Sequence, residues 1–286
     1  MRSNLLIVSG CLLALTLFSC QKESSEENDG GTDPSIIGLN CRIAKIDYQD
    51  TSGLIPTGSL AANINASDNA VTIIEFDSLS NFIISFADIV TIADTFHVNA
   101  DEYFIRDATS KQIIKFHGLV DPGNPASPFY DQLFTYNTNG NLIKKTKALS
   151  SALNIPYEQV DYNYSGGNMV SMTYKNLFTG QLESDASLTF YSSIIPKNYI
   201  YIFPDEEERA AYNQFFNFGK RSFNAMKDIK VRYYDGTGAL LDSAVSQFTN
   251  YQQSVDMYVV KVSMSGDAQP GIPAQPGRLQ FSYKCH

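Results

Sequence analysis

The sequence has no tryptophan and only three histidines among 286 residues, which narrows the chemistry it can support. The histidines, His97, His117 and His286, stand in no metal-ligand spacing, and no His-Glu-x-x-His motif occurs. The Gly-x-Ser-x-Gly motif of serine hydrolases and the phosphate-cradling Gly-x-x-x-x-Gly-Lys loop are also absent. We therefore expect a protein that is not an enzyme and that uses no catalytic residue, metal or cofactor.

Carboxylates keep one catalytic alternative open, because catalytic groups can be scattered along a sequence. A glycoside hydrolase needs two acids about 5–9 Å apart. Asp101, Glu102, Asp161 and Glu183 are available, but no local spacing brings two of them together. A hydrolase with dispersed carboxylates is therefore an alternative, and solvated charges on strand faces are the simpler interpretation.

The N-terminus has the order of a secretion signal. Arg2 precedes an apolar stretch from Leu5 to Phe18, and Ser19-Cys20 follows it. These 14 residues are fewer than the ~20 that span a bilayer. A small residue followed by cysteine resembles the lipobox of bacterial lipoproteins, which implies cleavage of a signal peptide over residues 1–19 and acylation of Cys20. The alternative is an uncleaved anchor helix.

Residues 20–35 predict a lipidated cysteine followed by a flexible acidic tether. The run Gln21–Glu27 is similar to the export tag that sends lipoproteins of Bacteroidota to the outer face of the outer membrane. We therefore expect a lipid-anchored outer-membrane protein that faces the cell exterior. The periplasmic face, with a generic charged tether, is the alternative.

The net charge of −9 disfavours two classes of partner. Residues 1–35 hold two cations and five acids, which leaves −6 for residues 36–286. Such a field repels nucleic acid and anionic headgroups. The expected partners are the membrane, through acyl chains on Cys20, and a glycan or an envelope protein.

Residues 36–286 predict a single, mainly antiparallel β domain, with a possible sub-boundary near residues 118–130. Apolar and polar residues alternate in short runs, which is typical of strands with one wetter face. The expected strands span residues 41–48, 71–76, 82–86, 112–117, 133–136, 160–164, 229–234, 257–262 and 279–283. We expect them to form an antiparallel sheet of successive hairpins.

Three tight hairpins are predicted at residues 136–142, 164–169 and 234–240. In each, the first strand ends in an aromatic residue, the turn contains Gly, Asn or Asp residues that tolerate positive φ, and the second strand begins with an apolar residue. Asn137, Asn139 and Asn141 also offer alternating oxygens to calcium, although this run lacks the carboxylates on which calcium sites usually rely.

One short helix is expected to pack across the sheet. Asp205 and Glu208 form a capping box, Tyr212 and Phe216 share one face, and Gly219 marks the end. A helix that docks a partner is the alternative.

The positions of the four cysteines leave one candidate disulfide. Cys11 lies in the signal and Cys20 would carry lipid, so Cys41 and Cys285 remain near the two ends of the folded part. In an oxidising compartment they could pair. Two separate buried thiols are the alternative.

The hairpins resemble YD repeats and, more closely, a set of uncharacterised surface lipoproteins of Bacteroidota. Phe134–Lys145 carries the resemblance, which covers residues 1–48 and 130–285. It implies a curved antiparallel sheet on the cell surface, and it implies no reaction.

Tyrosine is abundant, with 17 copies, and aromatic rings can stack on sugars. Tyr162, Tyr164, Tyr233 and Tyr234 are the candidate ligand-facing aromatics, although cross-strand packing also explains them. The expected function is a non-enzymatic binding or envelope-structural domain. A glycan-binding accessory lipoprotein of a polysaccharide-uptake system is the first alternative, and the hydrolase is the second.

Overall fold

The computed structural model describes residues 41–50, 70–76, 82–88, 90–121, 123–150, 153–197, 216–267 and 277–285. All of the regular secondary structure in these ranges is β-strand. The strands are β1 (Cys41–Asp50), β2 (Ala70–Phe76), β3 (Phe82–Asp88), β4 (Val90–Ile92), β5 (Thr95–His97), β6 (Tyr103–Arg106), β7 (Ile113–Leu119), β8 (Phe129–Tyr136), β9 (Leu142–Leu149), β10 (Pro156–Ser165), β11 (Asn168–Asn176), β12 (Leu182–Phe190), β13 (Met226–Tyr234), β14 (Leu240–Gln253), β15 (Val259–Gly266) and β16 (Gly277–Cys285).

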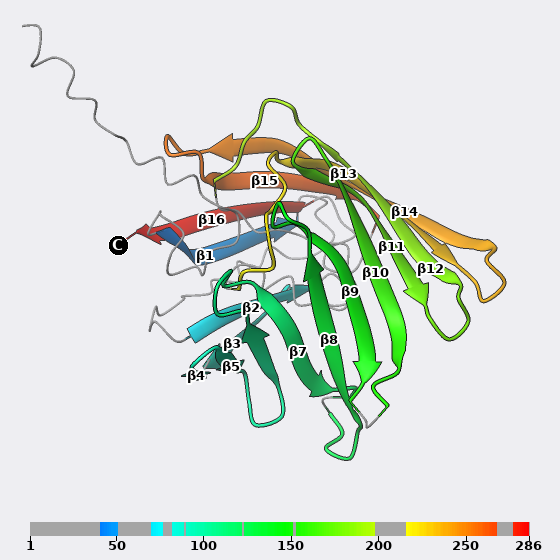
Figure 1. Cartoon of the computed structure of the whole chain (residues 1–286). Coiled ribbons are helices and arrows are strands. Elements are labelled where there is room, and N and C mark those ends of the chain that lie inside the picture. Colours follow the sequence, from blue (N-terminus) through cyan, green and yellow to red (C-terminus); the bar gives the residue numbers. More distant parts are fainter. Residues whose placement is uncertain are drawn as a thin grey trace, which may run out of the picture.

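Fourteen of the strands form one antiparallel sheet, in the order β1-β16-β15-β14-β13-β12-β11-β10-β9-β8-β7-β6-β5-β4. From β4 to β16 each strand pairs with the next one along the chain, and β1 adds to the far side of β16. The sheet is strongly curved, and its edges in the described residues are β1 and β4 (Figure 1). β2 and β3 pair as a separate hairpin.

The sequence predicted the fold class and all nine of the strands named from it, since each overlaps a strand of the structure. The three predicted hairpins are also confirmed, because β8 pairs with β9, β10 with β11, and β13 with β14. The possible sub-boundary at residues 118–130 falls on the connection between β7 and β8, which pair directly.

Two of the hairpin turns share one mechanism. An oxygen of Asn137 accepts hydrogen bonds of 3.0 Å from the backbone N–H groups two and four residues later. An oxygen of Asp235 accepts the equivalent pair at 2.8 Å. Gly140 and Gly238 then take φ of +81° and +84°, a conformation that glycine adopts without steric cost. This side-chain oxygen of Asn137, one of those that the sequence offered to calcium, therefore already accepts two hydrogen bonds within its own turn.

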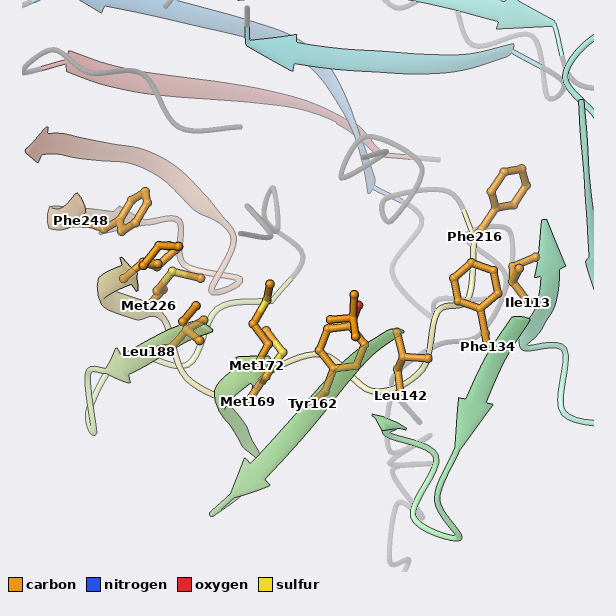
Figure 2. Close-up of a cluster of buried hydrophobic side chains, with 14 of the residues drawn as sticks. Ile113, Phe134, Leu142, Tyr162, Met169, Met172, Leu188, Phe216, Met226 and Phe248 are labelled. Carbon is orange, nitrogen blue, oxygen red and sulfur yellow. The ribbon is translucent and has the colours of Figure 1, made fainter. Parts of the chain in front are cut away.

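The hydrophobic core lies on the concave face of the sheet, and Figure 2 shows part of it. Directly opposite residues of neighbouring strands share a face, so the registers define rows across it. One fully buried row contains Tyr162, Met172, Ala186, Val231 and Ala244. Burial of one large apolar side chain contributes roughly 1.5–3 kcal/mol, so this face supplies most of the driving force for folding.

Residues 216–225, which we call the strap, run along one end of the sheet. Phe216 packs its ring 5.0 Å from Phe96 and 4.8 Å from Phe104, measured between ring centroids. The strap also hydrogen-bonds two hairpin turns: Lys220 N–H donates to Gly140 and Phe223 N–H donates to Gly167. The strap therefore closes one end of the concave face and holds neighbouring hairpins together.

The helix predicted from Asp205 lies largely outside the described residues. Its expected last turn, from Phe216 to Phe218, is irregular. Phe216 is nonetheless buried against the sheet, as the sequence predicted for that side chain. The packing comes from a non-helical segment, because the strap uses its backbone groups to bond the hairpin turns.

We expect Gly219→Ala to lower the free energy of unfolding by about 3 kcal/mol. Gly219 has φ of +92°, and an added Cβ would lie 2.7 Å from the carbonyl oxygen of Gly140. The matched control is Gly180→Ala, which has a similar φ of +74° but no atom within 4 Å of the added Cβ. The control should lose only about 1 kcal/mol in urea denaturation, and equal losses would show that the strap does not press on the turn.

The register of β1 and β16 places Cys41 directly opposite Cys285. Opposite residues of an antiparallel pair have Cα atoms about 4.5–5.5 Å apart. Disulfides need a Cα separation of about 4.4–6.8 Å. The two ends of the described chain thus meet at a separation that a disulfide can bridge.

We expect Cys41 and Cys285 to be oxidised to a disulfide in protein isolated from an oxidising compartment. Closure of so long a loop stabilises by roughly 5 kcal/mol in the chain-entropy model, so reduction should lower the Tm. The Cys41→Ser variant should lose this sensitivity to reductant. Mass spectrometry of the non-reduced protein tests the bond directly, and two free thiols at these positions would exclude it.

Candidate functional site

The convex face of the sheet carries a polar row. Its members are directly opposite residues of β9 to β13, namely Lys144, Asp161, Thr173, Asp185 and Arg232. Because burying charged side chains costs free energy unless they are paired, a face that carries such a row is suited to contact with water. The concave face, by contrast, is apolar.

Asp185 is the centre of the strongest ion pair on this face. Arg232 donates two parallel hydrogen bonds to it, at 2.8 and 2.9 Å, and Tyr234 donates a third at 2.7 Å. The hydrogen bond to Asp185 raises the pKa of Tyr234. The same carboxylate raises the pKa of the Arg232 guanidinium.

Two of the acids considered as catalytic candidates lie on the same sheet and have partners there. Asp161 accepts hydrogen bonds from Gln159, at 2.9 and 3.0 Å, and from Lys175 at 3.2 Å. Glu183 accepts one from Asn176 at 2.9 Å. These contacts join neighbouring strands or neighbouring positions, so they fit a structural role.

A second cluster occupies the convex side of β6, β7 and β8. His117 is stacked between Tyr103, at 4.8 Å, and Phe129, at 4.9 Å between ring centroids. Its Nδ1 lies 2.7 Å from one oxygen of Asp131, and Lys115 lies 2.9 Å from the other oxygen. His97 packs against the far side of this group, 5.6 Å from the Tyr103 ring.

The pKa of Asp131 is lowered by its partners. Burial alone would raise it, but the hydrogen bonds from His117 and Lys115 and the Lys115 charge outweigh that effect. A carboxylate whose pKa is lower in the folded state stabilises the fold above its unfolded pKa of about 3.9, and this stabilisation is lost as the pH falls through the folded value.

We expect Asp131→Asn to lower the free energy of unfolding at pH 7 by about 1–3 kcal/mol, because two polar partners lose a charged acceptor. The difference between wild type and variant should shrink below about pH 4, where the wild-type carboxyl takes up its proton. Urea denaturation at a series of pH values measures both effects. A difference that stays constant down to acid pH would show that the carboxylate charge does not act through these contacts.

One end of the sheet gathers exposed apolar side chains. The described residues expose sixteen large apolar side chains, and eight of them lie at this end, five on the connections between strands and three at the ends of β9 and β14. We call these eight residues the apolar rim: Val120, Leu149, Leu153, Ile155, Leu177, Phe178, Leu240 and Leu241. Exposed apolar side chains that gather at one end of a domain favour an interaction site there.

Contacts between neighbouring connections make the rim continuous. Ser150 N–H donates to the carbonyl of Phe129, next to the β7–β8 connection, and Leu177 N–H donates to the carbonyl of Tyr157. Ser184 of β12 pairs with Tyr233, which brings the β11–β12 turn beside the β13–β14 turn. The four connections follow one another along the lower right of Figure 1.

Phe178 is the most prominent aromatic of the rim. Its side chain is 69% exposed, and its ring lies parallel to that of Tyr157, with centroids 6.3 Å apart. Asn176 fixes the turn by accepting hydrogen bonds from the N–H groups of Phe178 and Thr179. The sequence contains an Asn-to-Gly turn here, but alternation did not reveal that its apolar residues stay exposed.

The candidate ligand-facing tyrosines are spread over both faces. Tyr162 is 3% exposed within the concave core, and Tyr164 and Tyr233 pack against that core. Tyr234 is the member of the set whose hydroxyl joins the convex-face network, through Asp185. The structure therefore does not bring the four rings together into one platform.

The remaining candidates divide by whether the structure describes them. Cys20, His286, the signal peptide and the tether lie outside the described residues. No group of three or more His, Cys, Asp or Glu side chains suited to a metal ion occurs in the described ranges. Within the same ranges, no helix has the length and apolar character needed to cross a bilayer.

No family model and no curated protein matches the sequence. Among solved structures, a porin-like protein from Bacteroides vulgatus ATCC 8482 matches 85% of this chain and 98% of its own, at 11% identity and a TM-score of 0.51. A porin-like protein from Bacteroides uniformis ATCC 8492 matches 85% and 96%, at 12% identity and 0.46. The first likeness shows that this chain shares its curved β fold with a Bacteroides protein.

Proposed function

We propose that this chain is an outer-membrane lipoprotein whose curved sheet serves as a binding or envelope-structural domain. Residues 1–19 are the signal peptide, Cys20 carries acyl chains, and residues 20–35 are the tether to the β domain. The likeness to a Bacteroides fold is compatible with the Bacteroidota-type lipobox and export tag of the sequence.

The apolar rim is the observation that carries the binding role. A domain that only had to remain dissolved would gain nothing from eight exposed apolar side chains along one end. Half of the exposed large apolar side chains of the described residues lie at this end, which makes it the best supported surface for a partner.

A non-enzymatic role is part of the proposal. Asp161, Asp185 and Asp131, three carboxylates of the convex face, are each engaged by cations of adjacent strands. Such pairing suits side chains that fix the register of a sheet. The orientation toward the cell exterior rests on the acidic run after Cys20.

We expect wild-type protein expressed with an alkynyl fatty acid to become labelled and the Cys20→Ser variant to remain unlabelled. Several acyl chains, at about 0.8 kcal/mol per buried CH₂, would hold the domain firmly where one chain would not. In-gel fluorescence after click coupling is the measurement. The matched control is Cys11→Ser, which should label like wild type, and equal labelling of the Cys20→Ser variant would overturn the anchor.

A further inference from the structure

We infer that the apolar rim is a membrane-contact surface, whose side chains enter the interfacial layer of a phospholipid bilayer with zwitterionic headgroups. The inference rests on the proposed function in one respect, since the anchor at Cys20 would keep the domain within reach of a bilayer. The rest of the argument comes from the rim itself.

The position of the rim suits insertion into a lipid bilayer better than docking to a folded protein. The apolar side chains of the rim lie on the connections β7–β8, β9–β10 and β11–β12 and at the ends of β9 and β14, so they stand at the margin of the sheet rather than in its concave core. A folded protein partner would need a groove complementary to these side chains to reach the packing density of an interface. A bilayer interface adapts to such tips and receives Leu and Phe side chains to a depth of about 5–10 Å.

The charges around the rim disfavour attraction by anionic headgroups. Asp121, Glu183 and Asp242 are exposed carboxylates on the same end of the sheet. Of the nearby cations, Lys175 is paired with Asp161, and Lys147 lies over the Tyr130 ring, 4.4 Å from its centroid. Binding would therefore depend on apolar insertion, and salt should leave it nearly unchanged, unlike the binding of a basic surface.

The turn after β11, which carries Phe178, is held by its own hydrogen bonds. Gly180 N–H donates to the carbonyl of Asn176 at 2.8 Å, and the Asn176 side chain accepts two further bonds from the turn. The turn that carries Phe178 is thus fixed before it meets a lipid surface. Little conformational entropy remains to be lost on insertion.

The tether is long enough for this orientation. β1 begins at the end of the sheet opposite the rim, because its register with β16 runs from Cys41 to Asp50. The chain between Cys20 and Cys41 spans at most about 70 Å when extended. A nine-residue strand such as β11 is about 30 Å long, and the 15 residues from Gln21 to Ser35 reach about 50 Å when extended, so the tether can exceed the length of the sheet along its strands and let the rim meet the bilayer.

The absence of tryptophan makes a clean test possible. Phe178→Trp places a single reporter in the rim, and Phe223→Trp places a matched reporter on the strap. Phe178 follows the end of β11 and Phe223 bonds Gly167 just before its start, so the two reporters flank the same strand. Phe223 is 57% exposed, which is similar to Phe178.

The full-length protein, purified as the cell makes it, is mixed with vesicles of phosphatidylcholine that contains brominated acyl chains. We expect the emission of the Phe178→Trp variant to move to shorter wavelength and to be quenched, and that of the Phe223→Trp variant to remain unchanged. Adding Leu153→Asp or Leu241→Asp to the Phe178→Trp variant should reverse most of the wavelength shift and quenching, since each removes one inserted apolar side chain while the acyl chains keep the protein on the vesicles. High salt should leave the quenching unchanged.

Three outcomes would overturn the inference. The first is that neither reporter responds to vesicles, and the second is that both respond equally. The third is that the emission of the Phe178→Trp variant shifts with protein concentration in the absence of vesicles, which would assign the rim to a protein partner such as a second copy. Fatty-acid labelling reports on Cys20 and quenching reports on position 178, so the anchor and the rim can fail separately.

Discussion

The structure depends on covering the apolar concave face of one long sheet. An antiparallel sheet buries one face only if something packs on it, and the strap does this at one end. Phe216 fills the space beside Phe104, and Gly219 lets the strap approach the β8–β9 turn to a distance that no Cβ would tolerate. Because the strap bonds the turns of separate hairpins, it joins local units into one curved layer.

Local chemistry made much of the fold predictable. The turns at Asn137 and Asp235 need only residues within five positions of each other, so the sequence displays them directly. The pairing of Cys41 with Cys285 was suggested by their positions alone, and the register of β1 and β16 is compatible with it. The order of the strands follows the chain almost throughout, which is why successive hairpins were sufficient to anticipate an antiparallel sheet, whereas its curvature was implied by the resemblance to surface lipoproteins.

The candidate site was less predictable because it depends on which face a residue occupies. Tyr162 and Tyr234 look alike in sequence, yet one is buried in the concave core and the other bonds Asp185 on the convex face. The pairing of β10 with β11 shifts register between Asn163 and Tyr164, and Met169 and Met172 of β11 are both buried although they stand three positions apart, so strict alternation does not predict which residues face the core. The His117–Asp131 contact joins two strands across 14 positions, so no short sequence motif could predict it.

The rim differs from the core in a way that points to function rather than folding. Successive residues of a strand face opposite sides, so the sheet can bury one of two neighbours and leave the other in water. Leu240 and Leu241 are neighbours and both are exposed, at 58% and 67%. Folding therefore uses neither side chain, and exposed leucine at both positions carries a solubility cost. The adjacent Leu177 and Phe178 are also both exposed, in the turn after β11, so a turn and a strand end each expose an apolar pair.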